Sequence, residues 1–496
     1  MKQQAFNPFL PLWECIPDGE PHVFGDRVYL YGSHDKMGGD TFCAQPYTVW
    51  SAPVSDLSDW SCRGVSYRAE QDPNYSERRP YMFAPDCVQG KDGRFYLYYC
   101  LAGYHGDHGY SGPISVAVSD TPDGEFAYYG FVRHPDGSEF QDYVLFDPAV
   151  INDEGTIRLY FGTDLGLANY PWLSHAVYLW KYQCKRFDRP LEEVKRGITG
   201  AFTVELDDDM LTVKGSARRI LPTKTWGTAF SKHPFFEASS IRKIGDLYYF
   251  VYSSLNNHEL CYATSRYPDR DFQFRGVIVS NGDVGFHGRK PKNRLNHTGN
   301  NHGGLVQIGD QWYIFYHRPT HGTDFSRQAC AEPIEILPDG SIAQVEMTSC
   351  GLNCKPLLDI GTYPAAICCN LTNGKMPHGG SRKPFPKIIW EDELIVAGLT
   401  SGTVVGYKYY DFRQADTLVV TLKGKAEGHL EVRNTMDGQP CGKIPVKPSE
   451  DWQEYAAPMN FASGRHPLYL RFVGKGNLKI RAFTLSKGAS HEKAGF

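Results

Sequence analysis

One arrangement of apolar and polar positions recurs five times in the first 345 residues of the chain. Each copy has a short apolar strand, a polar turn containing Gly or Asp, and an aromatic-rich second strand, which is typical of a β-hairpin. The copies read HVFGDRVYLYGSHD from His22, CVQGKDGRFYLYYC from Cys87, AVINDEGTIRLYFGTD from Ala149, SIRKIGDLYYFVYSS from Ser240 and LVQIGDQWYIFYHR from Leu305. A further strand pair follows each hairpin, and four strands per copy predict a five-bladed β-propeller over residues 1–345.

A different pattern follows the fifth copy. Residues 346–354 read as a linker, and the segments VVGYKYYDF, TLVVTLKG, HLEVRN, PLYLRFVG and LKIRAFTLS are short strands at the spacing of a β-sandwich. We expect this module to span residues 355–488, followed by a tail over 489–496. The predicted fold class is therefore all-β: a five-bladed β-propeller followed by a β-sandwich of the jelly-roll type.

The overall charge and composition exclude some partners. A net charge of −4 on 496 residues gives no electrostatic basis for binding nucleic acid or an anionic membrane, so neither is expected as a partner. The alternative classes for a propeller are an enzyme, a glycan-binding protein or a protein-interaction platform, and the repeats lack the Trp-Asp endings of the last class. The oligomeric state is left open.

The N-terminal segment and the cysteines bear on the compartment. The segment MKQQAFNPFLPLWEC has no continuous apolar stretch and contains two prolines, so we read it as mature sequence. The 13 cysteines are scattered and odd in number, which favours reduced thiols over a disulfide framework. We therefore expect a cytoplasmic protein.

Polar residues precede each hairpin at related positions. They are four carboxylic acids and one histidine: Asp18, Asp86, Asp147, Glu237 and His302. Because the first strand of a propeller blade lines the central channel, its leading residues should face the axis. Any one of them alone reads as a turn or loop residue, but like charges gathered in one place cost stability and usually mark chemistry. The repetition therefore predicts an active site at one end of the channel.

At these segments the chain resembles glycoside hydrolase family 43, over about residues 5–345. PDGEPHVF is similar to the first-blade motif, which implies that Asp18 is the general base. LFDPAVI is similar to the third-blade motif, which implies that Asp147 raises the pKa of the acid and orients it. FFEASSIRKIGDLYYFVYS is similar to the fourth-blade motif, which implies that Glu237 is the general acid.

The same resemblance implies residues that bind substrate. His302, in NHGGLVQIGDQWYIFYH, is expected on the axis beside a structural calcium ion or an ordered water. Arg327, in FSRQACAEPIEI, is expected to contact the terminal sugar, and Phe83, in MFAPD, to pack on it. We add His34, at the end of the first hairpin, to the substrate-binding residues. No organic cofactor is expected.

The first-blade motif leaves two candidates for the base. Asp18 is followed by Gly19 and Glu20, and strand alternation sends residues 18 and 20 to the same side. Periodicity therefore leaves Asp18 and Glu20 both open, and only the resemblance selects Asp18.

Together these residues predict an inverting mechanism. One carboxylate activates water and one protonated acid assists the leaving oxygen, while a third carboxylate keeps that acid protonated by like-charge repulsion. Long loops at 103–112, 165–175 and 223–235 are expected to close one end of the cleft, so the enzyme should act on chain ends. We expect release of a terminal pentose from plant-polysaccharide-derived oligosaccharides, with α-L-arabinofuranose as first choice. A β-xylosidase is the alternative within the family, and a non-catalytic glycan-binding propeller is the alternative of another class.

The C-terminal module resembles a carbohydrate-binding module of the family-6 type. Its closing strand carries Lys479, Arg481 and Ala482 where such modules usually carry Asn and Trp that hold sugar. We therefore expect the module to pack on the propeller or shape its active site rather than to bind glycan.

Overall fold

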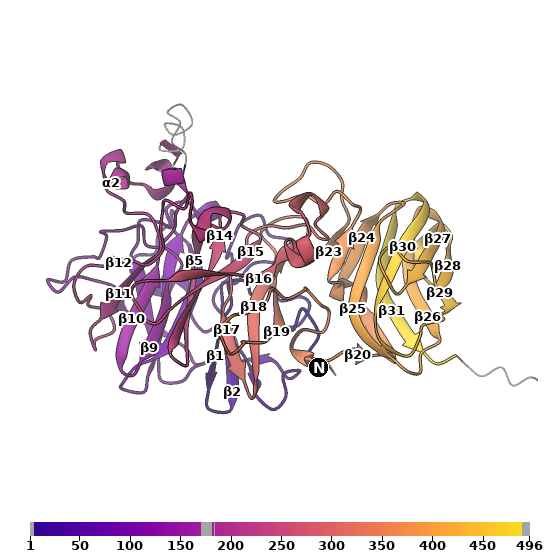
Figure 1. Cartoon of the computed structure of the whole chain (residues 1–496), viewed down its shortest axis with the longest axis horizontal. Coiled ribbons are helices and arrows are strands. Elements are labelled where there is room, and N and C mark those ends of the chain that lie inside the picture. Colours follow the sequence, from indigo (N-terminus) through magenta and orange to yellow (C-terminus); the bar gives the residue numbers. More distant parts are fainter. Residues whose placement is uncertain (1–3, 170–180, 183, 489–496) are drawn as a thin grey trace, which may run out of the picture.

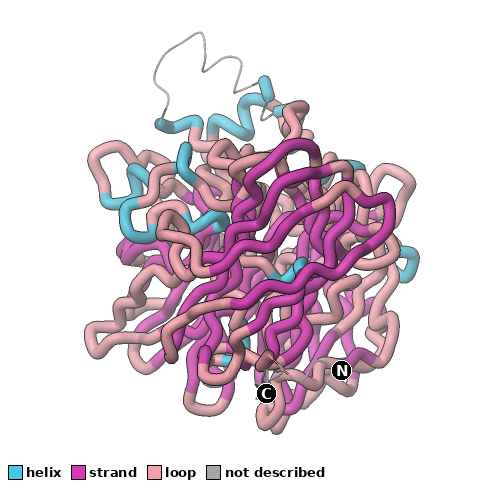
Figure 2. Tube along the Cα trace, turned by 90° about the vertical axis from the view of Figure 1, so that its right-hand side faces the viewer, coloured by secondary structure: helices cyan, strands magenta, loops and turns pink. Residues whose placement is uncertain are grey.

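The computed structural model describes residues 4–169, 181–182 and 184–488. Strands make up nearly all of its regular structure, and the short helices lie in the loops (Figure 2). The propeller lies on the left of Figure 1 and the sandwich on the right. No helix in the described ranges is long and apolar enough to cross a membrane.

Five separate antiparallel sheets form the blades, each numbered outward from the central channel. Blades 1 and 2 contain β1 (Glu20–Phe24), β2 (Arg27–Tyr31), β3 (Trp50–Pro53), β4 (Ser61–Cys62), β5 (Tyr81–Gln89), β6 (Phe95–Ala102), β7 (Ile114–Ser119) and β8 (Ala127–Phe131). Blade 3 contains β9 (Ala149–Asp153), β10 (Thr156–Phe161), β11 (Phe202–Leu206) and β12 (Arg218–Arg219). Blades 4 and 5 contain β13 (Phe235–Ile244), β14 (Leu247–Ser254), β15 (Glu259–Ser265), β16 (Gln273–Ser280), β17 (Leu305–Ile308), β18 (Gln311–Pro319) and β19 (Arg327–Ile334). The predicted propeller is confirmed.

The ring closes between blade 1 and blade 5. The innermost strands β1, β5, β9, β13 and β17 contact one another in that order, and β17 returns to β1. A parallel bridge joins Gly19 to Gly303, and a Cβ on Gly303 would lie 2.0 Å from the carbonyl oxygen of Phe315. Only glycine leaves room for this approach.

Blade 5 has three strands rather than four, and the N-terminal segment covers its outer edge. The Asn7 side chain donates to the carbonyl of Ala331 at 2.9 Å and accepts from the Ala331 amide at 3.0 Å. These two bonds replace those of a neighbouring strand along β19. Phe9 and Leu10 continue into the apolar core shared by blades 1 and 5.

The C-terminal module has two six-stranded sheets around one apolar core. One sheet contains β20 (Leu357–Leu358), β22 (Asn370–Thr372), β25 (Val404–Phe412), β27 (Ala426–Arg433), β28 (Gly442–Val446) and β30 (Gly464–Gly476). The other contains β21 (Gly361–Pro364), β23 (Lys387–Trp390), β24 (Leu394–Leu399), β26 (Thr417–Gly424), β29 (Ser449–Pro458) and β31 (Leu478–Ser486). Inward-facing apolar residues alternate with outward polar ones along β26, as the sandwich prediction requires.

Apart from residues 181–182 and 184–187, which are also helical, the other regular elements in the described part of the chain are short helical turns. They are η1 (Ala69–Gln71), η2 (Tyr104–Gly106), η3 (Leu167–Asn169), α2 (Leu191–Lys195), η4 (Ala229–Lys232), η5 (Asn281–Asp283), η6 (Phe286–Gly288), η7 (Pro291–Asn293), η8 (Gly351–Asn353) and η9 (Ala365–Ile367). Of these, α2 projects from the upper face of the propeller in Figure 1.

Buried polar contacts fix the two domains to each other. Lys408 of β25 is almost fully buried and pairs with Asp283 at 3.2 Å and with Glu346 at 2.7 Å. Arg318 of β18 donates to the carbonyls of Ala366 at 2.6 Å and Cys368 at 2.7 Å. The interface is therefore specific rather than a loose tether.

Candidate active site

A cavity of about 160 Å³ lies at the end of the propeller channel where the inner strands begin. Residues from all five blades line it: Asp18, Phe42, Phe83, His105, Gly106, Tyr110, Phe146, Asp147, Arg186, Phe236, Glu237, Ala238, Asn257, Asn300, Asn301, His302, Asp324 and Arg327. The three predicted catalytic carboxyl groups and Phe83, His302 and Arg327 thus share one cavity.

A backbone kink lies at or near the start of the inner strand in blades 1 to 4, beside these side chains. Asp18, Ala84, Asp147 and Ala238 occupy equivalent places in blades 1 to 4, and all have positive φ, at 57°, 38°, 45° and 69°. Non-glycine residues in this region are strained, and such strain concentrates at functional sites. At the cavity, the kink interrupts the regular alternation of side chains between the two faces of the strand.

Asp18 is held as a carboxylate. Arg327 donates to Asp18 Oδ1 at 2.9 Å, and Asp35 fixes the same guanidinium through two bonds of 2.8 and 3.0 Å. Burial by itself would raise the pKa of Asp18, but the charge of Arg327 holds that pKa below its ordinary value. Asp18 is therefore ionised near neutral pH.

His317 orients the backbone of Asp18. The Asp18 amide donates to His317 Nδ1 at 3.2 Å, and His317 Nε2 faces the Asn300 carbonyl at 3.0 Å. Burial lowers the pKa of His317 to about 3, so its ring is neutral, with the proton on Nε2. This tautomer satisfies both bonds.

Glu237 and Asp147 form the opposite half of the cavity. Burial raises the pKa of Glu237 to about 7, with the charge of Arg186 opposing the rise and Asp18 adding to it. Burial and the charges of Glu237 and Asp18 raise the pKa of Asp147 well above its ordinary value. Asp147 Oδ2 accepts from the Ala238 amide at 2.9 Å, which ties it to the residue after Glu237. Two negative charges at Glu237 and Asp147 would repel each other. This pair of carboxyl groups therefore keeps a proton near neutral pH.

Glu237 Oε2 is directed at the space a ligand would fill. The atom is buried and has no hydrogen-bond partner among the described residues. A buried polar atom left unpaired costs about 1–3 kcal/mol, so a substrate that supplies the bond gains that amount. This is the arrangement expected of a proton donor waiting for an oxygen.

His302 lies between the two carboxylate groups of Asp18 and Asp147. Its Nδ1 is 3.9 Å from Asp18 Oδ1 and 3.8 Å from Asp147 Oδ2, and its buried Nε2 has no partner among the described residues. Calcium prefers six to eight oxygen ligands. His302 would contribute one nitrogen, so these residues fit a calcium ion only if water supplies most of its shell.

Asp86 is not part of the cavity, contrary to the sequence prediction that it faces the funnel with the other carboxyl groups. The kink at Ala84 and a register shift in β5 place Asp86 one layer deeper in the channel. There it pairs with His22 Nε2 at 2.6 Å and accepts from the Val150 amide at 2.7 Å. Asp86 therefore connects blades 2 and 3.

Glu20 also lies in this deeper layer and does not line the cavity. Arg242 donates to Glu20 Oε2 at 2.8 Å, and Ser240 donates to it at 3.1 Å. Burial raises the pKa of Glu20 to about 8, against the charge of Arg242. Of the two first-blade candidates, Asp18 alone reaches the cavity.

His34 is not among the cavity residues, so its predicted sugar contact is not supported. Its Nε2 lies 2.8 Å from Glu14 Oε1 and its Nδ1 lies 2.7 Å from the Pro46 carbonyl. With both ring nitrogens in use, His34 anchors the loop between β2 and β3.

Sequence reasoning missed several polar residues that line the cavity, among them Asn300 and Asn301 and the three described next. Arg186 donates to the Tyr110 hydroxyl at 3.0 Å and lies 4.9 Å from the centre of that ring. Asn257, in the β14–β15 turn, and Asp324, before β19, each have a buried side-chain oxygen with no partner among the described residues. All three lie in loops outside the recurring hairpin, so no repeat marked them.

The predicted rim loops contribute unequally. His105, Gly106 and Tyr110 of the 103–112 loop line the cavity, whereas none of the residues 223–235 does. In the third loop, residues 165–169 do not line it, and 170–175 lie outside the described residues.

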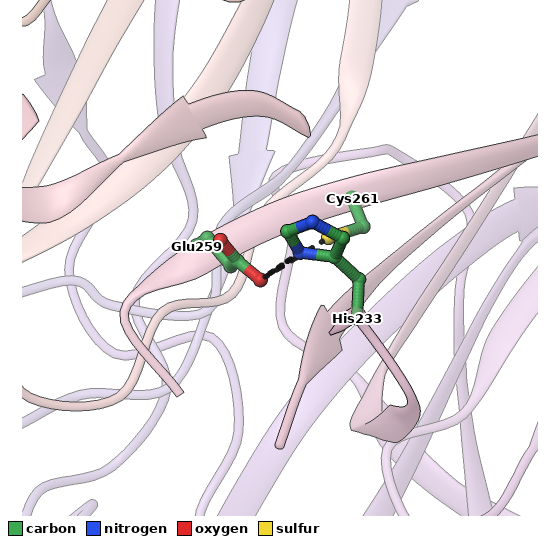
Figure 3. Close-up of side chains that lie close together, drawn as sticks. All are labelled: His233, Glu259 and Cys261. Carbon is green, nitrogen blue, oxygen red and sulfur yellow. Dashed lines mark hydrogen bonds and ion pairs between the residues drawn. The ribbon is translucent and has the colours of Figure 1, made fainter. Parts of the chain in front are cut away.

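Two clusters of side chains outside the cavity have the composition of metal ligands. They are Glu20 with His22 and Asp86, and His233 with Glu259 and Cys261 (Figure 3). In the first cluster, Arg242 already pairs with Glu20 at 2.8 Å. In the second, Glu259 Oε1 accepts from His233 at 2.6 Å, Ser254 at 2.6 Å and Asn256 at 2.8 Å. Both clusters are hydrogen-bonded supports in this structure, and the second holds the loop before β13.

In the C-terminal module, the closing strand β31 uses its charges internally. Lys479 pairs with Glu391, and Arg481 pairs with Glu393 and lies 5.1 Å from the ring centre of Trp452. The proposed absence of glycan binding by this strand stays a prediction.

Comparisons with known proteins agree with this fold. The sequence model of Glycosyl hydrolases family 43 matches residues 7–171 and 176–342. A xylosidase/arabinosidase from Thermoclostridium stercorarium is 42% identical over 504 residues, covering 98% of this chain and 99% of that protein. A xylosidase/arabinosidase from Bacteroides ovatus is 28% identical, covering 67% of this chain and 95% of that protein.

Solved structures give the same fold. A β-xylosidase/α-arabinofuranosidase from a compost microbial metagenome matches with a TM-score of 0.51 at 23% identity, covering 69% of this chain and 98% of that chain. The match of the family over most of the propeller, together with a relative 42% identical along nearly the whole chain, shows that this protein is a glycoside hydrolase and belongs to glycoside hydrolase family 43.

Proposed function

We propose that this glycoside hydrolase releases single terminal pentose residues from oligosaccharides, with inversion and with α-L-arabinofuranose as the preferred sugar. The observation that carries the proposal is the pairing, in one small cavity, of an ionised Asp18 with a Glu237 whose pKa is raised to about 7. Two carboxyl groups whose environments separate their pKa values are the usual base and acid of a glycosidase.

The two groups act from different sides of the channel. Asp18 begins blade 1 and Glu237 lies in blade 4, with blade 5 between them. Asp18, oriented by Arg327, takes a proton from water as it attacks the anomeric carbon. Glu237 gives its proton to the departing oxygen, and no covalent intermediate forms. Asp147 keeps Glu237 protonated and holds the backbone after it.

The size of the cavity supports attack at a chain end. At about 160 Å³, with the aromatic rings of Phe83, Phe146 and Tyr110 in its wall, it suits one sugar rather than a row of them. The described 103–112 loop closes the side of blade 2. An enzyme that cuts within chains would need a groove open at both ends.

The identity of the pentose rests on the relatives. Two of them are named xylosidase/arabinosidase, and a third, from Xylanibacter ruminicola, is named β-xylosidase. Release of terminal β-xylose is therefore the second candidate activity, with the same catalytic residues.

A panel of nitrophenyl pentosides tests the proposal directly. We expect cleavage of the α-L-arabinofuranoside at a higher kcat/KM than of the β-xyloside, and NMR of the first product should show the inverted anomer. A linear pentose oligosaccharide should yield monosaccharide from the start. Early products of two or more sugars would contradict attack at chain ends, and a retained anomer would contradict the mechanism.

We also propose a calcium ion beside His302, with mostly water in its shell. Exhaustive chelation should then lower activity or Tm modestly, and calcium, but not magnesium, should restore the lost part. An enzyme unchanged by chelation in both respects would leave His302 as a contact for sugar or water.

A further inference from the structure

A second groove lies outside the catalytic cavity, where the propeller meets the sandwich domain. Its volume is about 660 Å³, and it shares none of its described lining residues with the catalytic cavity. The propeller supplies Phe286 and His287 of η6, the connecting segment supplies residues between 345 and 356, and the sandwich supplies Tyr409 and Arg465. A groove of this size is typical of sites for small ligands, and it forms only when the two domains are docked.

Two cations in the wall of this groove have no carboxylate partner among the described residues. They are Lys355 and Arg465, and both side chains are exposed. The Arg465 guanidinium lies 3.9 Å from the centre of the Tyr409 ring. Stacking of this kind holds the planar group in one orientation and leaves its N–H edge available to a ligand.

The two acidic residues in the wall already have partners. Glu346 Oε1 pairs with Lys408 at 2.7 Å, and Glu346 Oε2 accepts from the Tyr409 hydroxyl at 2.7 Å. Glu332 is buried and accepts from the Thr348 amide at 2.7 Å. Burial raises the pKa of Glu332 to about 8, so this group is neutral at neutral pH. The charge that the groove offers to a ligand is therefore positive.

The loop that carries η6 adds to this positive charge. Residues 284–309 contain no Asp or Glu, although the whole chain has a net charge of −4. Four cations of this stretch have no carboxylate partner among the described residues: Arg289, Lys290, Lys292 and Arg294. The Arg289 amide donates to the Phe286 carbonyl at 3.1 Å, so the cationic stretch begins beside the groove. Unpaired like charges that gather near one groove raise the local concentration of an anionic ligand.

We propose that this groove binds a carboxylate-bearing sugar, a uronic acid of an oligosaccharide, through Arg465 and Lys355. The planar fork of arginine matches a carboxylate with two parallel hydrogen bonds, and lysine adds a point charge. Phe286, which is half-buried, offers apolar surface to the carbon atoms of the sugar ring. A nucleic-acid backbone carries a charge on every nucleotide, so two lining cations match a single carboxylate better.

The proposal goes beyond the release of a terminal pentose. Because the groove and the catalytic cavity share no described residue, binding in the groove does not depend on which pentose the enzyme releases. The sandwich domain would then recognise an acidic substituent of the oligosaccharide without a glycan-binding cleft of its own.

Calorimetry on the full-length protein tests the groove with two ligands. One is a xylo-oligosaccharide that carries a single glucuronic acid, and the other is the unsubstituted oligosaccharide of the same length. Both are measured in a Glu237→Gln background, which slows cleavage, and chromatography checks that the ligands stay intact. We expect the acidic ligand to bind about tenfold more tightly, the effect of one charged hydrogen-bonded contact, and this preference to shrink as salt is added.

The preference should be lost in Arg465→Gln and in Lys355→Gln. Lys447→Gln, at an exposed lysine between β28 and β29, is the control and should keep it. Arg465→Gln also removes the stacking on Tyr409, so Tm is measured for each variant. Lys355→Gln removes charge alone and, with Glu237 intact, should keep the wild-type Tm and the wild-type kcat/KM on a nitrophenyl pentoside.

Several results would overturn the proposal. Equal affinity for the two ligands would do so, as would a preference that survives in both groove variants. A short single-stranded DNA that binds as tightly as the acidic sugar, with the same loss in the variants, would show a general anion surface and refute the uronic acid. A wild-type enzyme inactive on nitrophenyl pentosides would refute the proposed function, whereas the calorimetry alone decides the groove.

Discussion

Three carboxyl groups that share one cavity differ in their immediate neighbours. Asp18 has a guanidinium at 2.9 Å, Asp147 has a backbone amide at 2.9 Å, and Glu237 Oε2 has no partner among the described residues. The same residue type therefore takes different protonation states within one site, since the charge of Arg327 favours a carboxylate and burial without a donor favours an acid.

Removing the acid or the base is the first test at this scale. We expect Glu237→Gln and Asp18→Asn each to lower kcat about a hundredfold or more, because general acid and base catalysis contribute about 10²–10⁴-fold. Steady-state kinetics on a nitrophenyl pentoside measures the loss, and circular dichroism checks the fold. Glu20→Gln is the matched comparison for the base. A severe loss in that variant beside a mild one in Asp18→Asn would move the base to Glu20.

The pH dependence of kcat should shift in opposite directions when Asp147 and when Arg186 is replaced, since both neighbour Glu237. Glu237 must be protonated, so activity falls as pH rises through its pKa of about 7. Asp147→Asn removes the carboxyl group that shares its proton with Glu237, so the mutual repulsion is lost, the pKa of Glu237 falls and the basic limb of kcat should move toward lower pH. Arg186→Gln removes a positive neighbour, raises the pKa and should move the limb toward higher pH. Asp18 and Arg327 also face Glu237 and stay unchanged in both variants. Shifts of the same sign in the two variants would contradict the assignment of the acid.

At the scale of elements, the loop before β13 is held by one buried carboxylate. Glu259 Oε1 accepts from His233, Ser254 and Asn256, and Asn256 also donates to the Lys232 carbonyl at 3.0 Å (Figure 3). Burial would raise the pKa of Glu259, but these bonds lower it to about 2. Because β13 carries Glu237, this anchor positions the strand of the acid.

Glu259→Gln should destabilise the protein by about 1.5–3 kcal/mol, the range for a hydrogen bond to a charged group. The contribution of Glu259 is fully present above the ordinary pKa of about 4.5 and is lost as pH falls toward 2, so the Tm difference between wild type and variant should shrink below pH 4.5. Thermal unfolding at several pH values measures it. Glu205→Gln, at a β11 carboxylate whose side chain is 33% exposed, is the control and should show almost no difference. A Tm gap that is constant with pH would refute the charged anchor.

At the scale of the whole molecule, the propeller and sandwich share a buried ionic contact. Lys408 of the sandwich is 1% exposed and lies between Asp283 and Glu346 of the propeller side. Phe6, from the N-terminal segment, packs in the sandwich core, so this segment also joins the propeller to the sandwich.

Lys408→Met should therefore cost about 3–5 kcal/mol, because it leaves Asp283 buried without its partner. Denaturant unfolding should show one transition in wild type, since the domains depend on each other, and the midpoint should fall in the variant. Lys425→Met, on an exposed lysine of the sandwich, should leave the midpoint unchanged. A variant with wild-type stability would mean that the interface contributes little to folding.

The sequence alone was enough for the repeating architecture and for part of the site. A hairpin depends on alternation and turn residues within about fifteen positions, so its five copies predicted the blades without knowledge of their contacts. Asp18, Asp147 and Glu237 were found because each directly precedes or begins an inner strand; their catalytic roles stay predictions.

Tertiary structure decided which polar residues meet. The kink at Ala84 moved Asp86 one layer down the channel, and the Glu14 carboxylate engaged His34, although both had been assigned to the site from their positions beside the hairpins. Arg186, Asn257 and Asp324 reach the cavity from loops far apart in the chain. Periodicity describes which face a residue takes on its own strand, but closure of the ring and docking of the sandwich determine which side chains of different strands share a space, and no local pattern encodes that distance.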